Sequence, residues 1–458
     1  MEKKMTRRNF LKVAGTSTLA IGATAATGCV TGNNSKSVKG AADPDGGKME
    51  YRTNPENGDK ISLLGYGCMR WPMIKGKDGK DEVDQNSVNE LVDYAYKHGV
   101  NYYDTSPAYL QGQSEKAAGL ALSRYPRKSY YLATKLSNFN VWSRDASMKM
   151  YHDSFGQLQT DYYDYYLLHA IGSGGTDAFN ARYVDNGIMT FLLKEREAGR
   201  IRSLGFSFHG TQDAFDYFME LDDKYHWDFV QIEMNYLDWE HAKVPENVNA
   251  DYLYSELDKR NKPIVVMEPL LGGRLSNVPE AVADKLKERE PQKSIASWAF
   301  RFVGSYPRVI TALSGMDAMA PLQDNLDTFR HFKALDRKEL DILKEIADMM
   351  DEYPTVPCNY CKYCMPCPFG VNIPEIFKHY NRAVNEGFTA QSKEQKDFQK
   401  LRKKYLISYD RAVESLRQAS HCIGCHHCEP HCPQSIEIPK ELHRIDRYVE
   451  KLRQGTLE

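Results

Sequence analysis

Short apolar runs alternate with helical segments between residues 61 and 313 of the chain. Runs rich in β-branched and aromatic residues predict eight strands, at 61–67, 100–105, 130–135, 163–169, 202–207, 229–234, 263–268 and 309–313. Apolar positions at helical spacing separate the strands, at 88–98, 114–123, 146–158, 190–198, 214–223, 252–260 and 294–303. Eight such repeats in about 280 residues predict a (β/α)8 barrel, in which side chains at the C-terminal ends of the strands carry the chemistry.

A doubly wound parallel sheet is the alternative fold for the same alternation. That fold marks its dinucleotide site with G-x-G-x-x-G after a strand, and none of the predicted strands is followed by this motif. The nearest match, Gly65-Tyr66-Gly67, lacks the third glycine. We therefore predict an α/β protein with a TIM barrel over residues 49–352. A helix over 336–351 leaves the barrel, and the Pro-rich segment 354–357 marks the boundary.

Four polar residues stand at or just after corresponding strand ends. Asp104 ends the second strand and Tyr109 follows it, while Lys135 ends the third strand and His169 the fourth. On a barrel, all four face one rim. A lysine ammonium beside a phenol lowers the pKa of the phenol, so Tyr109 can donate a proton to a carbonyl oxygen. Asp104 would then hold Lys135 in place, and His169 would orient the same oxygen. Taken singly, each residue also suits packing or a surface charge.

Eight of the ten cysteines form two groups near the C-terminus. They are Cys358, Cys361, Cys364 and Cys367 in the first group, and Cys422, Cys425, Cys428 and Cys432 in the second. The second group has the C-x2-C-x2-C-x3-C-P spacing of bacterial two-cluster ferredoxins, and the first is one residue shorter before its last cysteine. Structural zinc, which also uses C-x2-C pairs, is the alternative. We predict two [4Fe–4S] clusters in a domain over residues 353–458.

The two-cluster pattern exchanges the fourth cysteine of each motif. By analogy, one cluster is held by Cys358, Cys361, Cys364 and Cys432, and the other by Cys422, Cys425, Cys428 and Cys367. The segment between the motifs resembles the α-helical ferredoxin module, with apolar positions at Ile376, Phe377, Tyr380, Ala412, Leu416 and Ala419. Ile373-Pro374 and Ile438-Pro439 follow the motifs at similar distances, which indicates an internal duplication. We expect the nearby His421, His426, His427 and His431 to border the clusters or lie at the surface.

The N-terminus has the features of an export signal. Arg7-Arg8, followed by Phe10-Leu11-Lys12, precedes a weakly apolar run over residues 13–27. This pattern resembles the twin-arginine signal, whose route carries proteins that fold and load cofactors before crossing the membrane. Thr27-Gly28-Cys29 also resembles a lipoprotein processing site, which would place a lipid anchor on Cys29. We expect a signal peptide over residues 1–29, a flexible linker over 30–48, and a periplasmic or membrane-anchored lipoprotein.

Charge and composition exclude several classes of protein. The 60 basic and 62 acidic residues leave a net charge of -2, which offers no electrostatic footprint for nucleic acid. With 41% hydrophobic and 27% charged residues the chain is typical of a soluble globular protein. It lacks an uninterrupted apolar stretch of about 20 residues, so a polytopic membrane protein is excluded.

From about residue 60 to residue 325 the sequence resembles the aldo/keto reductase family. The resemblance rests on segments at the predicted strand ends, namely Asp104-Thr105-Ser106-Pro107-Ala108-Tyr109, Ala133-Thr134-Lys135, Leu167-Leu168-His169, Gly205-Phe206-Ser207, Gln231-Ile232-Glu233 and Glu268-Pro269-Leu270. It implies hydride transfer between NADP(H) or NAD(H) and an aldehyde or ketone, with Tyr109 as the general acid. It also implies a cofactor site in which Ser207 and Gln231 contact the nicotinamide amide, Gly272, Gly273, Ser314 and Gly315 meet the phosphates, and Asn325 lies near the adenosine.

The family pattern is incomplete at three places. Phe208 stands where many members have Asn, and Met267 stands where an aromatic ring usually stacks on the nicotinamide. Residues 315–325 contain no Lys or Arg, although the family often binds the 2′-phosphate there. The sequence therefore leaves the choice open between NADPH, NADH and neither.

The sequence is consistent with two functions. A nicotinamide passes two electrons as a hydride, whereas each iron–sulfur cluster passes one, so the two halves do not couple directly. The first function is an oxidoreductase that interconverts a small carbonyl compound and an alcohol, sugar-like if Trp71, Trp142 and Tyr236 form stacking platforms. The second is an electron-transfer protein whose barrel binds or docks a substrate without free nicotinamide. Either a redox partner protein, such as a flavoprotein, or a quinone exchanges electrons with the clusters, or the clusters serve structure or docking.

Overall fold

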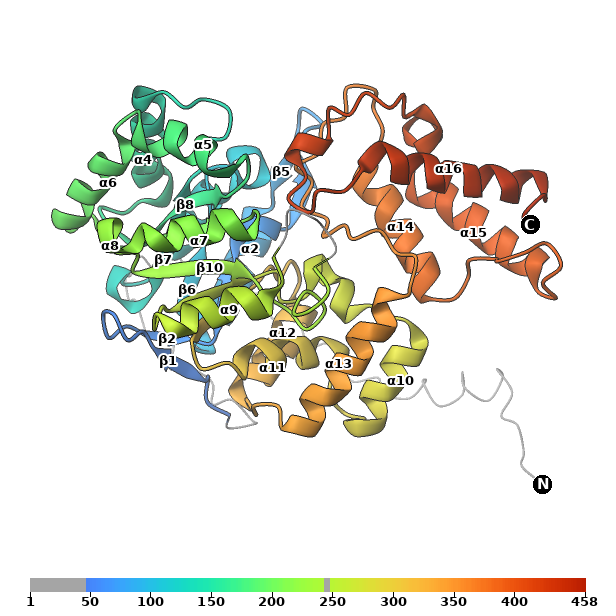
Figure 1. Ribbon diagram of the computed structural model, residues 1–458, viewed down its shortest axis with the longest axis horizontal. Helices are drawn as coiled ribbons and strands as arrows, with labels where there is room; N and C mark the ends of the chain where they lie inside the picture. Colours follow the sequence, from blue (N-terminus) through green and yellow to red (C-terminus); the bar gives the residue numbers. More distant parts are fainter. Residues whose placement is uncertain (1–46, 243–247) are drawn as a thin grey trace, which may run out of the picture. The chain divides into compact units, whose positions relative to one another are not determined.

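The computed structural model describes residues 47–242 and 248–458 (Figure 1). Arg7-Arg8 and Cys29, which carry the predicted export signal and lipid anchor, lie outside the described residues. Across the described ranges, none of the helices combines the length and apolar character needed to span a membrane.

A closed barrel of eight parallel strands confirms the predicted fold. In chain order the strands are β3 (Leu64–Gly67), β6 (Tyr102–Asp104), β7 (Tyr131–Leu136), β8 (Tyr163–Ile171), β9 (Ile201–Phe208), β10 (Phe229–Glu233), β11 (Ile264–Met267) and β12 (Val309–Ser314). The pairing of β12 with β3 closes the ring, with Leu313 opposite Gly65. Because all strands run the same way, their C-terminal ends meet at one rim.

Helices α2 (Gln85–Lys97), α3 (Ser114–Leu122), α4 (Arg144–Leu158), α6 (Ile188–Glu197), α7 (Gln212–Glu220), α9 (Ala250–Lys259), α11 (Ile295–Gly304) and α12 (Met319–Arg330) follow the strands. The short helices α5 (Gly175–Phe179) and α8 (Asp222–Tyr225) and the longer helix α10 (Glu280–Arg289) lie in the connections. Several helices begin before the first apolar position, because the side chains of Asp84, Ser143 and Thr211 cap their first turns.

The predicted first strand is wrong in one respect. Residues 61–67 do not form one strand, because Leu63 separates β2 (Lys60–Ser62) from β3. Strand β2 pairs antiparallel with β1 (Tyr51–Thr53), so only β3 belongs to the barrel. Ile61 is fully buried and packs with the interior side chains Tyr102, Ala133, Tyr165, Leu167, Phe229, Val265, Ile310 and Leu313. A second antiparallel hairpin, β4 (Met73–Lys75) with β5 (Asp81–Val83), follows β3.

Helix α13 (Arg337–Asp351) leaves the barrel, as predicted, and begins with a capping box between Asp336 and Glu339. The C-terminal region contains α14 (Ile373–Asn385), α15 (Phe398–Ala412) and α16 (Ile438–Gln454). Both α14 and α16 carry proline in their first turn, the position where its missing N–H costs least. The two Ile-Pro pairs therefore start equivalent helices.

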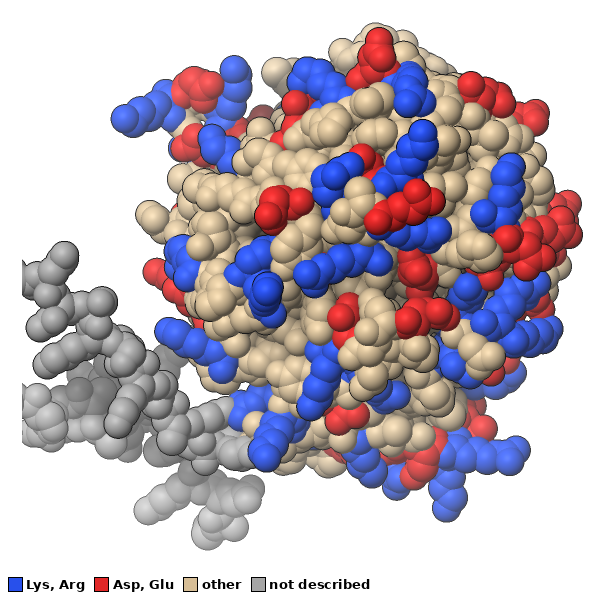
Figure 2. All heavy atoms as spheres, turned by 90° about the vertical axis from the view of Figure 1, so that its left-hand side faces the viewer, with Lys and Arg blue, Asp and Glu red and all other residues tan. Residues whose placement is uncertain are grey.

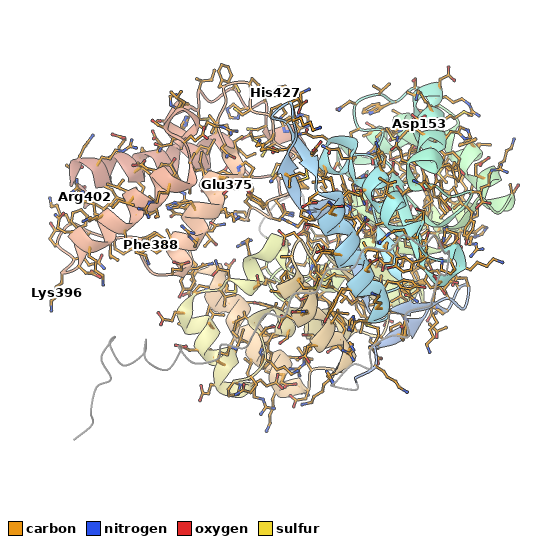
Figure 3. The ribbon with its side chains drawn as sticks, turned by 180° about the vertical axis from the view of Figure 1, so that it is seen from behind. Asp153, Glu375, Phe388, Lys396, Arg402 and His427 are labelled. Atoms are coloured by element: carbon orange, nitrogen blue, oxygen red, sulfur yellow. The ribbon has the colours of Figure 1, made fainter. Side chains whose placement is uncertain are left out.

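The helical region has its own apolar core, which includes Phe377, Phe388, Tyr405, Ile445 and Leu452, and most of the grouped cysteines pack against it. Figure 3 shows Glu375 and Phe388 near the two ends of α14, and Arg402 on α15. The Arg402 guanidinium donates to the Arg453 carbonyl at 2.8 Å, which ties α15 to α16.

Solvent exposure in the C-terminal region differs from expectation at Leu416 and agrees with it at four histidines. Leu416, expected on a buried helical face, lies in a short 3-10 turn with 78% of its surface exposed. His421, His426, His427 and His431 are all exposed, in line with a surface position. On the face drawn in Figure 2, acidic and basic side chains are interspersed rather than gathered by sign.

Candidate functional site

A cavity of about 1590 Å³ opens at the C-terminal ends of the barrel strands. Its walls come from both halves of the chain. The barrel contributes, among others, Asp104, Tyr109, His169, Ser207 and Gln231, and the C-terminal region contributes Cys358, Asn359, Cys361, Tyr363 and Cys432. Three of the four predicted catalytic residues, Asp104, Tyr109 and His169, and three predicted cluster ligands therefore border the same space.

Lys135 and Asp104 form a buried ion pair at the floor of the site. The Lys135 Nζ donates to Asp104 Oδ1 at 2.5 Å and to the Thr105 carbonyl at 3.0 Å. Both side chains are almost completely excluded from solvent. Burial raises the pKa of Asp104 and lowers that of Lys135, while each charge opposes the shift of the other. Since an unpaired buried charge is strongly unfavourable, each residue keeps the other in position.

Tyr109 begins a short 3-10 turn after β6 and is 7% exposed. Lys135 Nζ lies 4.8 Å from the centroid of its ring, so the two predicted partners are brought together. Burial raises the pKa of Tyr109 well above its usual value of 10, and Asp104 adds to the rise. The lowering of the pKa that we expected from Lys135 is outweighed, because burial disfavours the charged phenolate. The phenol is therefore protonated, as a proton donor must be before reaction.

His169 lies edge-on to Tyr109, with ring centroids 5.7 Å apart. Its Nδ1 forms hydrogen bonds with the hydroxyl groups of Ser137, at 2.6 Å, and Ser106, at 3.2 Å. Burial and then the charge of Lys135 lower the pKa of His169 well below 6.5, so the imidazole is neutral. With Nδ1 engaged, Nε2 is the ring nitrogen left for a substrate oxygen.

The residues expected at the nicotinamide also line the cavity. Gln231 donates from Nε2 to the Met267 sulfur at 3.5 Å, and its Oε1 is buried without a hydrogen-bond partner among the described residues. Ser207 Oγ accepts a hydrogen bond from the Ala170 N–H at 2.8 Å. An unpartnered buried acceptor beside a cavity suits a ligand that brings an N–H donor, such as a carboxamide.

The phosphate end of the expected cofactor path is partly covered by this chain. Gly272 has φ +66°, and a Cβ placed on it would stand 1.9 Å from the Asn359 carbonyl oxygen. A Cβ on Gly315 would stand 2.9 Å from Cδ of Arg70. Gly273, at φ +99°, and Ser314 line the cavity, and Asn325 donates from Nδ2 to Ser314 Oγ at 2.9 Å. The nicotinamide end therefore fits the expected group, whereas Asn359 and Arg70 occupy the glycine turns.

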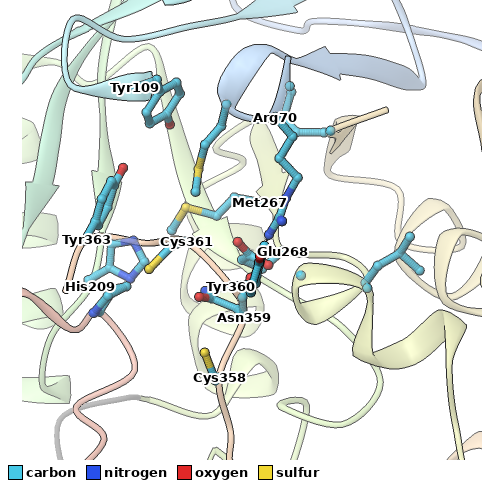
Figure 4. Close-up of a pocket in the computed structure, with 18 of the residues that line it drawn as sticks. Arg70, Tyr109, His209, Met267, Glu268, Cys358, Asn359, Tyr360, Cys361 and Tyr363 are labelled. Carbon is cyan, nitrogen blue, oxygen red and sulfur yellow. The ribbon is translucent and has the colours of Figure 1, made fainter. Parts of the chain in front are cut away.

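Sequence reasoning missed several residues of the site. Arg70, Glu268, Asn359 and Tyr363 surround the cavity in the close-up of Figure 4, together with His209. Glu268 could have been noticed, because it ends a predicted strand. No local signal points to Asn359 or Tyr363, which reach the barrel only through the packing of the C-terminal region.

Of the three aromatic residues considered as substrate platforms, only Trp142 lines the cavity. It is 43% exposed and is fixed by a hydrogen bond from its Nε1 to the Phe139 carbonyl at 2.9 Å. Trp71 is 2% exposed and packs on Tyr66, and Tyr236 is 3% exposed in the core. These two side chains are packing residues.

The eight grouped cysteines are all free thiols, and cysteines of the two motifs lie near one another. The first-motif residues Cys358, Cys361 and Cys364 each lie within electrostatic range of Cys432. Cys422, in turn, lies within electrostatic range of Cys367 and Cys425, and Cys364 also lies within range of Cys428. Cys432 beside the first motif and Cys367 beside Cys422 are the pairs that the exchanged ligand pattern requires.

Within residues 47–242 and 248–458, no three His, Cys, Asp or Glu side chains converge as ligands of a single metal ion. A [4Fe–4S] cluster binds one thiolate per iron, so its four thiolates surround the cluster instead of converging on a point. The all-thiolate donor set thus fits iron–sulfur clusters.

Both halves of the chain match known protein families. Residues 63–348 match the model of the Aldo/keto reductase family, and residues 357–437 match the 4Fe-4S dicluster domain. L-galactose dehydrogenase of Arabidopsis thaliana is 24% identical over 322 residues, or 66% of this chain and 95% of that protein.

Solved structures share the barrel. The holo form of an aldo-keto reductase from Bacillus halodurans has a TM-score of 0.51 at 22% identity, covering 65% of this chain and 96% of that one. An aldo/keto reductase from Klebsiella pneumoniae in complex with NADP and acetate has a TM-score of 0.52 at 19% identity, covering 65% and 95%. The family match spans more than half of the chain and contains the four residues gathered at the rim. The protein is therefore an oxidoreductase that belongs to the aldo/keto reductase family and carries a 4Fe-4S dicluster domain.

Proposed function

We propose that the protein interconverts a small carbonyl compound and an alcohol by hydride transfer, with Tyr109 as the general acid. The observation that carries the proposal is the convergence of Tyr109, His169 and the Lys135–Asp104 pair on one cavity. A nicotinamide dinucleotide would supply the hydride when bound beside Ser207 and Gln231. Tyr109 would give its proton to the carbonyl oxygen, so that a hydride at carbon and a proton at oxygen complete the reduction.

The other site residues act by position and charge. Nε2 of neutral His169 would hydrogen-bond the substrate oxygen and orient it toward the Tyr109 hydroxyl. Lys135 would stabilise the phenolate that forms when Tyr109 loses its proton, because an ammonium favours the charged form of a neighbouring phenol. Asp104 keeps Lys135 within the site.

We propose a sugar or a similar polyol as the substrate class. Trp142 offers an exposed indole at the cavity wall, and aromatic faces suit the apolar faces of sugar rings. The relative from Arabidopsis thaliana is named for the oxidation of a sugar, L-galactose, which points to the same class.

A second function is favoured by one observation. The Asn359 backbone rests on Gly272, one of the turns expected to meet the cofactor phosphates. If this contact is permanent, the barrel binds its substrate without free nicotinamide. The protein then transfers electrons between the substrate and a partner protein or quinone through its two clusters.

An anaerobic titration separates the two functions. The protein with its clusters loaded is mixed with NADPH and then NADH, while cofactor fluorescence and cluster absorbance are recorded together. We expect saturable quenching or enhancement of the nicotinamide fluorescence by at least one of the two cofactors. Fluorescence identical to that of free cofactor, at every protein concentration, would favour the second function.

We also propose that the protein is exported by the twin-arginine route to the periplasm, with or without a lipid on Cys29. Ligation of a cluster and folding of its domain are coupled, so the protein must cross the membrane folded and loaded. Arg7→Lys together with Arg8→Lys should retain the loaded protein in the cytoplasm, as measured by cell fractionation. Lys3→Arg with Lys4→Arg, which leaves the pair intact, is the matched control. Export of the first variant at the parental level would remove the proposal.

A further inference from the structure

Arg70, which ends the short 3-10 turn after β3, spans the two glycine turns of the cavity. Its Cβ, Cγ and Cδ lie 3.2, 3.0 and 2.9 Å from the point where a Cβ on Gly315 would stand. At the other end, its Nη2 donates to the Asn359 carbonyl oxygen at 2.6 Å. That carbonyl is the atom that rests on Gly272. A side chain at Gly272 would collide with the Asn359 backbone, and one at Gly315 would force the Arg70 side chain to shift.

Most N–H donors of the Arg70 guanidinium make no hydrogen bond to the described residues. Its charged neighbours are Glu268 and Lys362, and among the described residues its hydrogen bond goes to the neutral Asn359 carbonyl. A guanidinium has five N–H donors in a planar fork that matches two oxygens of a phosphate. A charge-assisted pair with a phosphate is about twice as strong as a neutral hydrogen bond.

The same residues connect the cavity to the cysteines. Asn359 lies directly after Cys358 and two residues before Cys361, and all three border the cavity. In the view of Figure 4, Arg70 extends toward Asn359 and Glu268, with Cys358 and Cys361 nearby. A change in the partner of Arg70 therefore bears directly on the loop that carries two predicted cluster ligands.

We propose that Arg70 is the phosphate-binding residue of this barrel, and that a dinucleotide phosphate replaces the Asn359 carbonyl as its partner. This inference rests on the proposed hydride-transfer function. Arg70 would bind the pyrophosphate, which NADPH and NADH share, and it would supply a cation that residues 315–325, with no Lys or Arg, lack. Since Asn359 then loses its bond to the barrel, occupancy of the cofactor site is transmitted to the loop of Cys358 and Cys361.

The test uses the protein with its clusters loaded and three probes, NADPH, NADH and ADP-ribose, which has the pyrophosphate but no hydride-transferring ring. Affinity is measured by fluorescence for the first two and by calorimetry for the third. Arg70→Gln should weaken all three by about 10- to 100-fold, the range for a lost hydrogen bond to a charged group. Arg70→Lys keeps the charge without the fork and should fall between. Arg124→Gln, which removes an arginine paired with Asp93 on the outside of the barrel, is the matched control.

A second readout tests the link to the cysteines. ADP-ribose should change the visible circular dichroism of the clusters in the parent and in Arg124→Gln, and leave that of Arg70→Gln unchanged. Iron content and far-ultraviolet circular dichroism verify that each variant is folded and loaded. If Arg70→Gln unfolds, Arg70→Lys supports the inference only by binding ADP-ribose more weakly than the parent.

The outcomes separate this inference from the proposed function. A parent that binds NADPH or NADH, together with Arg70 variants of equal affinity for all probes, overturns the role of Arg70 and leaves the proposed function standing. A parent that binds none of the three probes overturns both. A cluster signal that does not respond to ADP-ribose in the parent overturns the proposed transmission to the loop.

Discussion

Replacing Tyr109 by Phe should lower kcat/KM for carbonyl reduction by a factor of about 10² to 10⁴, the usual contribution of a general acid. The change removes one oxygen from a 7% exposed ring and leaves its contact with Lys135 and His169 in place. Because the phenol need not touch the dinucleotide, cofactor affinity should stay nearly constant. Steady-state kinetics with a reducible aldehyde or ketone, combined with cofactor fluorescence, measures both quantities.

Tyr96→Phe is the matched control for this variant. Tyr96 donates to Ser129 Oγ at 2.8 Å on the outside of the barrel, so its hydroxyl is lost without a change in the cavity. We expect the Tyr96→Phe variant to have the same kcat/KM as the parent protein. Near-parental turnover by Tyr109→Phe would mean that another group donates the proton, and the proposed mechanism would have to be abandoned.

Loss of the cluster ligands should have the second large effect. Two [4Fe–4S] clusters predict about eight iron and about eight sulfide per chain after anaerobic purification. Replacing Cys361 or Cys422 by Ala should each remove about four of both, because each cysteine belongs to a different proposed cluster. Cys68→Ala, which alters a buried free cysteine outside both motifs, should keep the full content.

Double variants decide the exchanged ligand pattern. Cys361→Ala with Cys432→Ala affects one proposed cluster and should lose about four iron. Cys361→Ala with Cys367→Ala takes both residues from the first motif, yet should lose about eight, because Cys367 is grouped with Cys422. A loss of about eight iron in the Cys361/Cys432 double variant and about four in the Cys361/Cys367 double variant would assign each motif to its own cluster. Two zinc ions without sulfide in the parent would refute iron–sulfur binding altogether.

The sequence by itself determined the elements and the chemistry that depend on local pattern. A strand or helix follows from the period of its apolar positions, so the barrel, most helix positions and α13 could be predicted. Asp104, Lys135 and His169 could be placed together, because equivalent strand ends of a parallel barrel meet at one rim. The cysteine spacing likewise predicted the dicluster domain, which the family comparison confirmed.

Only the tertiary structure decided how the two halves share one cavity. The contact between Arg70 and Asn359 joins residues 289 positions apart, and no local period or spacing encodes a contact of that range. The predicted first strand is divided for the same reason, because residues 60–62 pair antiparallel with β1, a contact that the local pattern does not encode. The direction of the Tyr109 pKa shift was also mistaken from sequence, because burial and then the charge of Asp104, both products of packing, outweigh the expected effect of one lysine.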